Sequence, residues 1–156
     1  MLTQEQLVIL KADILADPAL ANAYDEDVAH AYNESATPEY IVWKSAVDPD
    51  EIMRNGMDWT QVDNLTVGKA RIWEWMTRLG SFNPAKPNLR AGIDAAWVGT
   101  AAMLAVRATI YTHCKRTATR AEKLFASGTG TTASPSAMVF EGFLTYSDVS
   151  AARQLP

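Results

Sequence analysis

Apolar residues recur at intervals of three and four along most of residues 1–127, which is the spacing of one buried face of an α-helix. The clearest case is residues 4–16, where Thr3 and Gln6 are spaced to form a capping box at the helix start. Asp17 and Pro18 end this helix and begin a second one over residues 18–23. The same patterns predict helices over 27–32, 49–54, 66–79, 89–98, 101–112 and 117–127, with a single turn over 60–63.

The helix expected over residues 66–79 has the broadest apolar coverage in the chain. Its apolar positions cover more than half of its circumference and include Val67, Ile72, Trp73, Trp75 and Met76. A helix of this kind needs neighbours on two sides, so we expect it near the centre of a helical bundle.

Two stretches have less certain local structure. Residues 40–44 are β-branched and aromatic, which suits either a short strand or one turn of helix at this length. The basic helix over 117–127 has Thr117 as its expected N-cap and Gly128 as its αL terminator. It follows the apolar helix over 101–112 so closely that the two could form one bent rod.

Residues 129–156 are poor in charge and hold too few apolar residues to build a core of their own. Such a segment stays mobile, or it packs on this domain or on a neighbouring copy. Residues 138–146 alternate loosely and could add a strand to a sheet edge, and residues 147–153 could close with one helical turn. The predicted fold is mainly α: a helical bundle domain over 1–127 and an extended C-terminal arm over 128–156, able to add a short β-strand or hairpin.

Length and composition narrow the class of protein. With 156 residues and 48% hydrophobic content, the chain can bury one sizeable core and is expected to form a single domain. We expect a cytoplasmic protein without membrane contact, because no apolar run approaches the roughly 20 residues that cross a bilayer and no basic signal-peptide region opens the chain. A single cysteine forms no internal disulfide, and with only two histidines it makes a zinc site improbable.

The formal charge of −4 conceals an uneven distribution. Residues 1–63 hold 13 acidic and 3 basic side chains, whereas residues 64–127 hold 3 acidic and 10 basic ones. The acidic stretch 1–63 and the basic stretch 64–127 can fold back on each other within one subunit. Alternatively, the acidic face of one copy meets the basic face of the next, which favours a head-to-tail ring.

No group of residues predicts catalysis, and we expect neither an enzyme nor a bound cofactor or metal. The glycine-rich stretch that begins at Gly128 follows a helix, whereas a phosphate-binding loop precedes one. His113 and Cys114 are adjacent, so on a helix they diverge by about 100° and cannot act as a base and a nucleophile on each other. Trp73 and Trp75 are better explained by core packing than by stacking on nucleic-acid bases.

Two sets of residues are candidates for contacts with other molecules. The first set, Lys115, Arg116, Arg120 and Lys123, is basic and suits DNA phosphates or an acidic partner, although it also fits a solvated helix end. The second set consists of the apolar residues of the arm between positions 138 and 146. The expected subunit or portal interface comprises Lys115, Arg116, Arg120, Lys123, Met138, Val139, Phe140, Phe143, Leu144 and Tyr146.

The sequence carries several stretches that resemble one protein family. They are Leu2-Thr-Gln, Ile41-Val-Trp-Lys, the run Lys115-Arg-Thr-Ala-Thr-Arg-Ala-Glu-Lys-Leu-Phe-Ala-Ser-Gly-Thr-Gly-Thr-Thr-Ala-Ser-Pro, Glu141-Gly, Asp148-Val and the terminal Leu-Pro. Together they look like a family of small proteins encoded among the structural genes of tailed bacteriophages. The resemblance covers nearly the whole chain, is densest from residue 110 onward, and is weakest over residues 60–87.

Within that family context, the architecture is similar to head-to-tail connector (adaptor) proteins. The resemblance implies a ring, commonly twelvefold, that lies between the portal protein and a tail or nozzle protein and inserts a C-terminal arm into the portal. It also implies assembly in the host cytoplasm, a place in the neck of the virion, and passive contact with DNA in the central channel. Alternatives are a capsid decoration or head-completion protein, and a DNA-binding regulatory factor.

Overall fold

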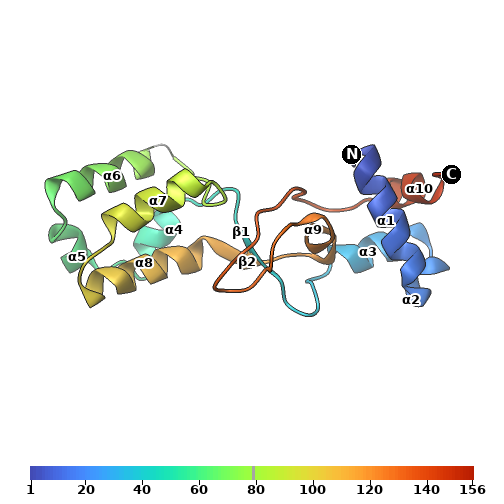
Figure 1. Cartoon of the computed structure of the whole chain (residues 1–156), viewed down its shortest axis with the longest axis horizontal. Helices are drawn as coiled ribbons and strands as arrows, with labels where there is room; N and C mark the ends of the chain where they lie inside the picture. Colours follow the sequence, from blue (N-terminus) through green and yellow to red (C-terminus); the bar gives the residue numbers. More distant parts are fainter. Residues whose placement is uncertain (79) are drawn as a thin grey trace. The chain divides into compact units, whose positions relative to one another are not determined.

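The computed structural model describes residues 1–78 and 80–156, and over these residues the fold is mainly α, as predicted (Figure 1). Leu79, the expected last residue of one helix, lies outside them. The elements in chain order are α1 (Gln4–Ala16), α2 (Pro18–Ala21), α3 (Asp25–Asn33), β1 (Ile41–Trp43), α4 (Pro49–Arg54), α5 (Trp59–Asp63), α6 (Val67–Arg78), α7 (Pro87–Ala96), α8 (Ala101–His113), β2 (Lys115–Thr117), α9 (Arg120–Phe125) and α10 (Tyr146–Arg153).

The chain forms two compact units. The first unit consists of Met1–Val42 and Thr117–Pro156, and the second unit consists of Trp43–Arg116. This division differs from the expected one, in which residues 1–127 form one bundle and residues 128–156 an arm. The C-terminal residues belong to the first unit, and the second unit is an insertion between the two stretches that build the first.

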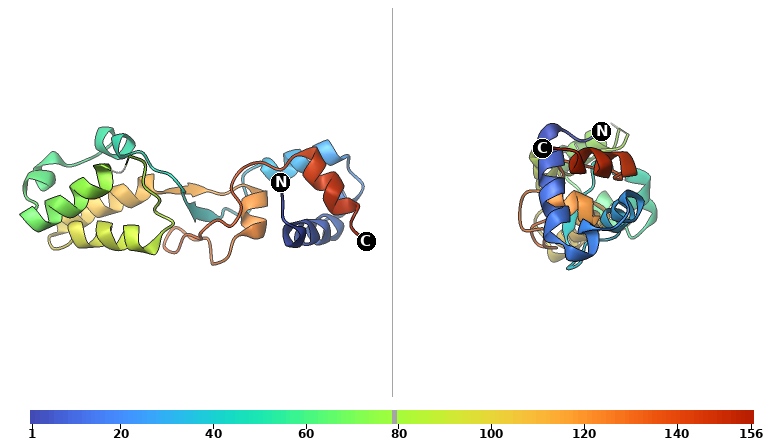
Figure 2. Two further views of the ribbon diagram at one scale, coloured as in Figure 1. Left: turned by 90° about the horizontal axis from the view of Figure 1, so that it is seen from above. Right: turned by 90° about the vertical axis from the view of Figure 1, so that its right-hand side faces the viewer.

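The first unit is built from α1, α2, α3, α9 and α10. Helix α10 packs against α1 and α3, and Figures 1 and 2 show it beside α1. Capping boxes begin three of these helices: Thr3 with Gln6, Thr119 with Glu122, and Thr145 with Asp148. The core of the unit includes Leu10, Ile14, Val28, Tyr32, Phe125, Leu144, Val149 and Ala152.

The second unit is built around α4, α6, α7 and α8. The rings of Trp73 and Trp97 meet edge to face with centroids 5.5 Å apart, and this pair joins α6 to the C-terminal end of α7. The core of the unit includes Trp43, Val47, Ile52, Trp73, Met76, Ile93, Trp97, Val106 and Ile110.

Helix α6 does not occupy the central position that its apolar pattern predicts. It packs against α7, and only Trp73 and Met76 on this helix are buried. Val67, Ile72 and Trp75 are exposed. The expectation of neighbours on two sides was therefore wrong for the described part of this chain, because the second apolar side of α6 faces solvent.

The β structure settles the ambiguous stretch over residues 40–44 as a strand. Strands β1 and β2 form a two-stranded sheet. The Ala118 N–H donates to the Tyr40 carbonyl at 2.8 Å, and the Lys44 N–H donates to the Cys114 carbonyl at 2.9 Å. Residue numbers therefore rise along one strand as they fall along the other, and the pairing is antiparallel.

This strand corrects the prediction of a basic helix that begins at Thr117. Residues 115–117 are extended, and α9 begins only at Arg120, with Thr119 as its N-cap. The Thr119 hydroxyl accepts from the Glu122 N–H at 3.2 Å, and Glu122 accepts from the Thr119 N–H at 2.9 Å. Because β2 separates α8 from α9, the two helices do not form one bent rod.

The C-terminal stretch contributes a helix and no strand within its described residues 128–156. The expected strand over 138–146 is not formed. Upstream of it, the Ser136 N–H donates to the Ile41 carbonyl at 3.0 Å, as part of an isolated bridge. Across the described residues, every helix is too short or too polar to span a bilayer.

Candidate interaction surfaces

Arg120, one of the predicted interface cations, is held inside the first unit. Its guanidinium lies 3.2 Å from the Asp13 carboxylate and 3.1 Å from that of Asp17, and it stacks over the Tyr32 ring at 4.5 Å. The Tyr32 hydroxyl donates to Asp13 as well. Burial, reinforced by this neighbouring carboxylate, raises the pKa of Tyr32. Arg120 therefore joins α9 to α1 and to Asp17, which begins α2.

Of the other three predicted cations, Lys123 lines a pocket of the first unit together with Arg120, and Lys115 and Arg116 lie in β2. Lys123 donates to the Pro38 carbonyl at 3.3 Å and lies over the Tyr40 ring. Lys115 lies over the rings of Trp43 and Tyr111, and Arg116 follows it in β2. Arg120 and Lys123 belong to the first unit, whereas Lys115 and Arg116 belong to the second. Neither compact unit by itself contains the predicted four-residue cluster.

The predicted apolar interface residues of the arm divide into buried anchors and exposed side chains. Phe140 packs edge to face on Phe125, with centroids 5.5 Å apart, and Leu144 is only 3% exposed. Val139 is 70% exposed and Phe143 is 74% exposed. Tyr146 is also exposed, and Met138 is half-buried. Residues 138–144 are thus fixed to the first unit on one side and present apolar side chains on the other.

Asn33 holds this segment in place, although sequence reasoning did not single it out. Its side-chain amide donates to the Leu144 carbonyl at 2.9 Å and accepts from the Leu144 N–H at 2.8 Å. These two bonds satisfy both backbone groups of a buried residue. The pairing joins residues far apart in sequence, so no local pattern reports it.

Arg153 attaches the C-terminal helix α10 to the end of α2 and the start of α3. Its guanidinium donates to the Ala23 carbonyl at 2.8 Å, to the Leu20 carbonyl at 2.8 Å and to Asp25 at 2.6 Å. Leu20 belongs to the last turn of α2, and its carbonyl also accepts from the Ala23 N–H at 3.2 Å. One cation thus joins the end of α2 and the start of α3 to α10.

A groove of about 580 Å³ lies between α5 and α6 in the second unit. Its apolar wall is formed by Trp59, Val62, Leu65, Val67 and Ala70, and its polar lining by Asp63, Arg71 and Glu74. Trp59 is 59% exposed and Val67 is 71% exposed. This groove was not predicted from the sequence. The broad apolar coverage of the helix expected over residues 66–79 indicated only that a second side of this helix needed a neighbour.

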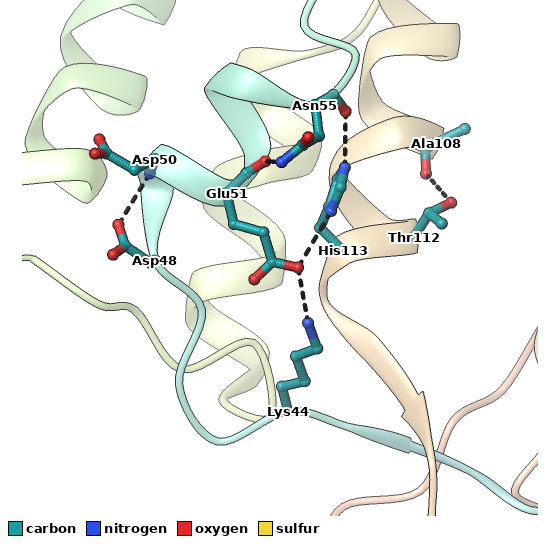
Figure 3. Close-up of polar contacts among 8 residues, drawn as sticks. All are labelled: Lys44, Asp48, Asp50, Glu51, Asn55, Ala108, Thr112 and His113. Atoms are coloured by element: carbon teal, nitrogen blue, oxygen red, sulfur yellow. Dashed lines mark hydrogen bonds and ion pairs between the residues drawn. The ribbon is translucent and has the colours of Figure 1, made fainter.

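His113 takes part in a polar cluster that joins α8 to α4 in the second unit (Figure 3). Its Nδ1 lies 3.4 Å from the Glu51 carboxylate, and its Nε2 lies 2.9 Å from the Asn55 carbonyl. Lys44 donates to the same Glu51 oxygen at 3.0 Å. The hydrogen bond from Lys44, with a smaller one from His113, lowers the pKa of Glu51.

The adjacent Cys114 is fully buried. Burial raises the pKa of its thiol to about 12. A thiol with this pKa contains almost no thiolate near neutral pH and is a poor nucleophile. The cluster around His113 therefore supplies structural hydrogen bonds and does not activate the neighbouring cysteine.

The two units differ strongly in formal charge. The first unit contains 11 acidic and 4 basic side chains, for a charge of −7. The second contains 7 acidic and 10 basic side chains, for a charge of +3. The charge division along the sequence does not coincide with the unit boundaries, because the acidic residues 43–63 belong to the second unit.

Among residues 1–78 and 80–156, no group of three or more His, Cys, Asp and Glu side chains is placed to hold a metal ion. Comparisons with protein-family models, curated proteins and solved structures returned no significant match.

Proposed function

We propose that this chain is a structural subunit of a tailed-bacteriophage virion that assembles into a homo-oligomeric ring at the neck and joins the portal to the tail. The phage context comes from the sequence resemblance described above. The main observation in support of a ring is that one chain contains two compact units with formal charges of −7 and +3.

Opposite charges on two units favour contacts between unlike units of neighbouring copies. Contacts between two acidic units or two basic units are opposed by like-charge repulsion. Unlike units meet either head to tail, where repetition of the contact closes into a ring when the rotation between copies divides a full turn, or reciprocally in an antiparallel two-fold dimer. The charge division supports both arrangements, and the resemblance to connector proteins favours the ring.

The surface for virion partners is narrower than the whole C-terminal arm. Residues 144–153 are committed to the first unit through Leu144, α10 and Arg153. The exposed side chains Val139, Phe143 and Tyr146 remain available for a portal, a tail or nozzle protein, or another copy. Of the four basic residues proposed for partners or channel DNA, Arg120 is already engaged by two carboxylates.

Two measurements test the proposal. Sedimentation velocity of the purified protein should show an oligomer at low ionic strength that dissociates as salt is raised, because salt screens the attraction between unlike units. Quantitative mass spectrometry of purified particles should then find this chain at a copy number close to that of the portal.

Each alternative predicts a different result. A decoration protein would be present in numbers comparable with the major capsid protein, and a regulatory factor would be absent from particles. A protein that remains monomeric at every concentration and salt, alone and with portal, would contradict the ring.

A further inference from the structure

Helix α1 carries apolar residues on two opposite sides. Leu10 and Ile14 lie in the core of the first unit. The opposite side, which we call the outer face of α1, is exposed and consists of Val8, Ile9, Ala12, Leu15 and Ala16. These residues recur at intervals of three and four, so they form one continuous strip along the helix. A helix that is apolar on both sides normally packs against neighbours on both sides, and the described residues cover only one side of α1.

The outer face of α1 has the shape of a helix-packing surface. Val8 is 54% exposed and Leu15 is 62% exposed. Single exposed apolar side chains are common on proteins, but a continuous strip is typical of an interaction site. Ala12 and Ala16 lie beside these larger residues and leave room for bulky side chains of a partner. The face therefore suits a second helix that carries large apolar side chains.

Helix α6 of the second unit has a matching surface. Ile72 and Trp75 are three residues apart, so they are neighbours on the helix surface, and both are exposed. Gly68, one turn before Ile72, lies on the same side and has open space where a Cβ would be. Trp73 and Met76, on another side of the helix, are buried in the core. We call the strip formed by Gly68, Ile72 and Trp75 the outer face of α6.

The charged side chains of these two helices are complementary in sign. Those of α1 are Glu5, Lys11 and Asp13, which leaves one more acidic than basic residue. Those of α6 are Lys69, Arg71, Glu74 and Arg78, which leaves two more basic than acidic residues. Like charges oppose the pairing of α6 with a second α6 and, more weakly, of α1 with a second α1. Pairing of α1 with α6 brings opposite charges together along the contact itself.

We infer that the outer face of α1 in one copy packs against the outer face of α6 in a second copy. The helices have 13 and 12 residues, so at about 1.5 Å per residue both strips are about 18–20 Å long. The contact joins the first unit of one copy to the second unit of another, and its repetition can close a ring. This inference rests on the proposed homo-oligomer and specifies the helices that make its subunit contact.

Cysteine cross-linking between separately purified variants tests the contact. Val8→Cys places a thiol on the outer face of α1, and Gly68→Cys places one on the outer face of α6; both positions are exposed. Ala105→Cys, at an exposed position on α8 of the second unit, serves as the matched control. The native Cys114 does not compete, because it is buried and its raised pKa keeps the thiol protonated.

Mild oxidation of mixed Val8→Cys and Gly68→Cys proteins at low salt should give a heterodimer several-fold faster than the mixture of Val8→Cys with Ala105→Cys. Without oxidation, Leu15→Gln and Trp75→Gln should each weaken self-association about tenfold, as expected for loss of a large apolar side chain at an interface. Ala105→Gln should leave self-association unchanged. Circular dichroism should show native helix content in each variant, because all three positions are exposed.

Other outcomes overturn the inference in distinguishable ways. Salt-sensitive oligomers whose affinity ignores both Leu15→Gln and Trp75→Gln would refute this contact but leave the proposed ring intact. If Val8→Cys cross-linked to itself faster than to Gly68→Cys, α1 would pair with a second α1 and the inferred contact would be wrong. A protein that is always monomeric would refute the contact and the ring together.

Discussion

Leu144 and Phe143 are adjacent in sequence but have opposite environments, and this pair gives the sharpest test of how the C-terminal residues are attached. Leu144 is 3% exposed and belongs to the core of the first unit. Phe143 is 74% exposed. We predict that Leu144→Ala destabilises the first unit strongly, whereas Phe143→Ala leaves its stability nearly unchanged.

The magnitude follows from burial. Truncating a buried leucine to alanine costs about 2–5 kcal/mol, which combines lost transfer free energy with the cavity that remains. We expect about 3 kcal/mol, because the backbone hydrogen bonds of Leu144 to Asn33 survive the substitution. Surface substitutions such as Phe143→Ala usually stay within about 0.5 kcal/mol.

The assay must report on the first unit specifically. All five tryptophans lie in the second unit, so their fluorescence does not follow the first. Hydrogen exchange read by mass spectrometry on peptides from α1 and α3 gives the local opening free energy, because both helices pack against α10. A loss of about 3 kcal/mol raises the exchange rate by roughly 100-fold when exchange follows the opening equilibrium.

Equal effects of the two variants on α1 and α3 would refute this reasoning. If Leu144→Ala left exchange in both helices unchanged, the C-terminal residues would not be a part of the core in solution. If Phe143→Ala were as damaging as Leu144→Ala, the segment would be packed through its other face.

Three further predictions concern the polar contacts and the backbone. Arg120→Ala should lower the unfolding free energy of the first unit by about 1–3 kcal/mol in urea titrations, because Asp13 and Asp17 lose their shared cation, while Arg120→Lys should lose less. Gly130→Ala should speed amide hydrogen exchange over residues 128–136, because Gly130 has a φ of +61° and an added Cβ would overlap the Tyr40 ring. Gly142→Ala is the control for backbone strain alone, since Gly142 also has a positive φ but has open space where the Cβ would lie. Hydrogen bonding from Lys44 lowers the pKa of Glu51 from 4.5, so its stabilising contribution is complete above that pH and is lost as pH falls through the lower folded-state pKa. Glu51→Gln should therefore flatten the acid side of the stability curve of the second unit, measured by tryptophan fluorescence; an unchanged slope would contradict this assignment.

Local signals in the sequence located most of the helices. The capping box of Thr3 and Gln6 correctly begins α1, and Asp48 with Pro49 correctly begins α4. These signals work because a cap and the helix it begins are a few residues apart. The same logic failed at Thr117, where the capping pair Thr119 and Glu122 two residues later determined the start of α9.

Contacts between distant residues were not predictable in the same way. The pairing of Tyr40 with Ala118 and the bond between Asn33 and Leu144 depend on chain segments that no local spacing connects. The groove between α5 and α6 had a partial signal, because the surplus apolar surface of α6 was visible in the sequence. The apolar periodicity indicated that this surface of α6 needed a packing partner. It could not indicate that, among the described residues, the surface stays exposed to solvent.

The order of segments along the chain has a consequence for biosynthesis. Met1–Val42 emerges from the ribosome before Thr117–Pro156, the stretch that completes its core. The second unit is complete once Arg116 has emerged. During translation the second unit can therefore fold first, while the apolar faces of α1 and α3 stay unburied until α10 has been synthesised.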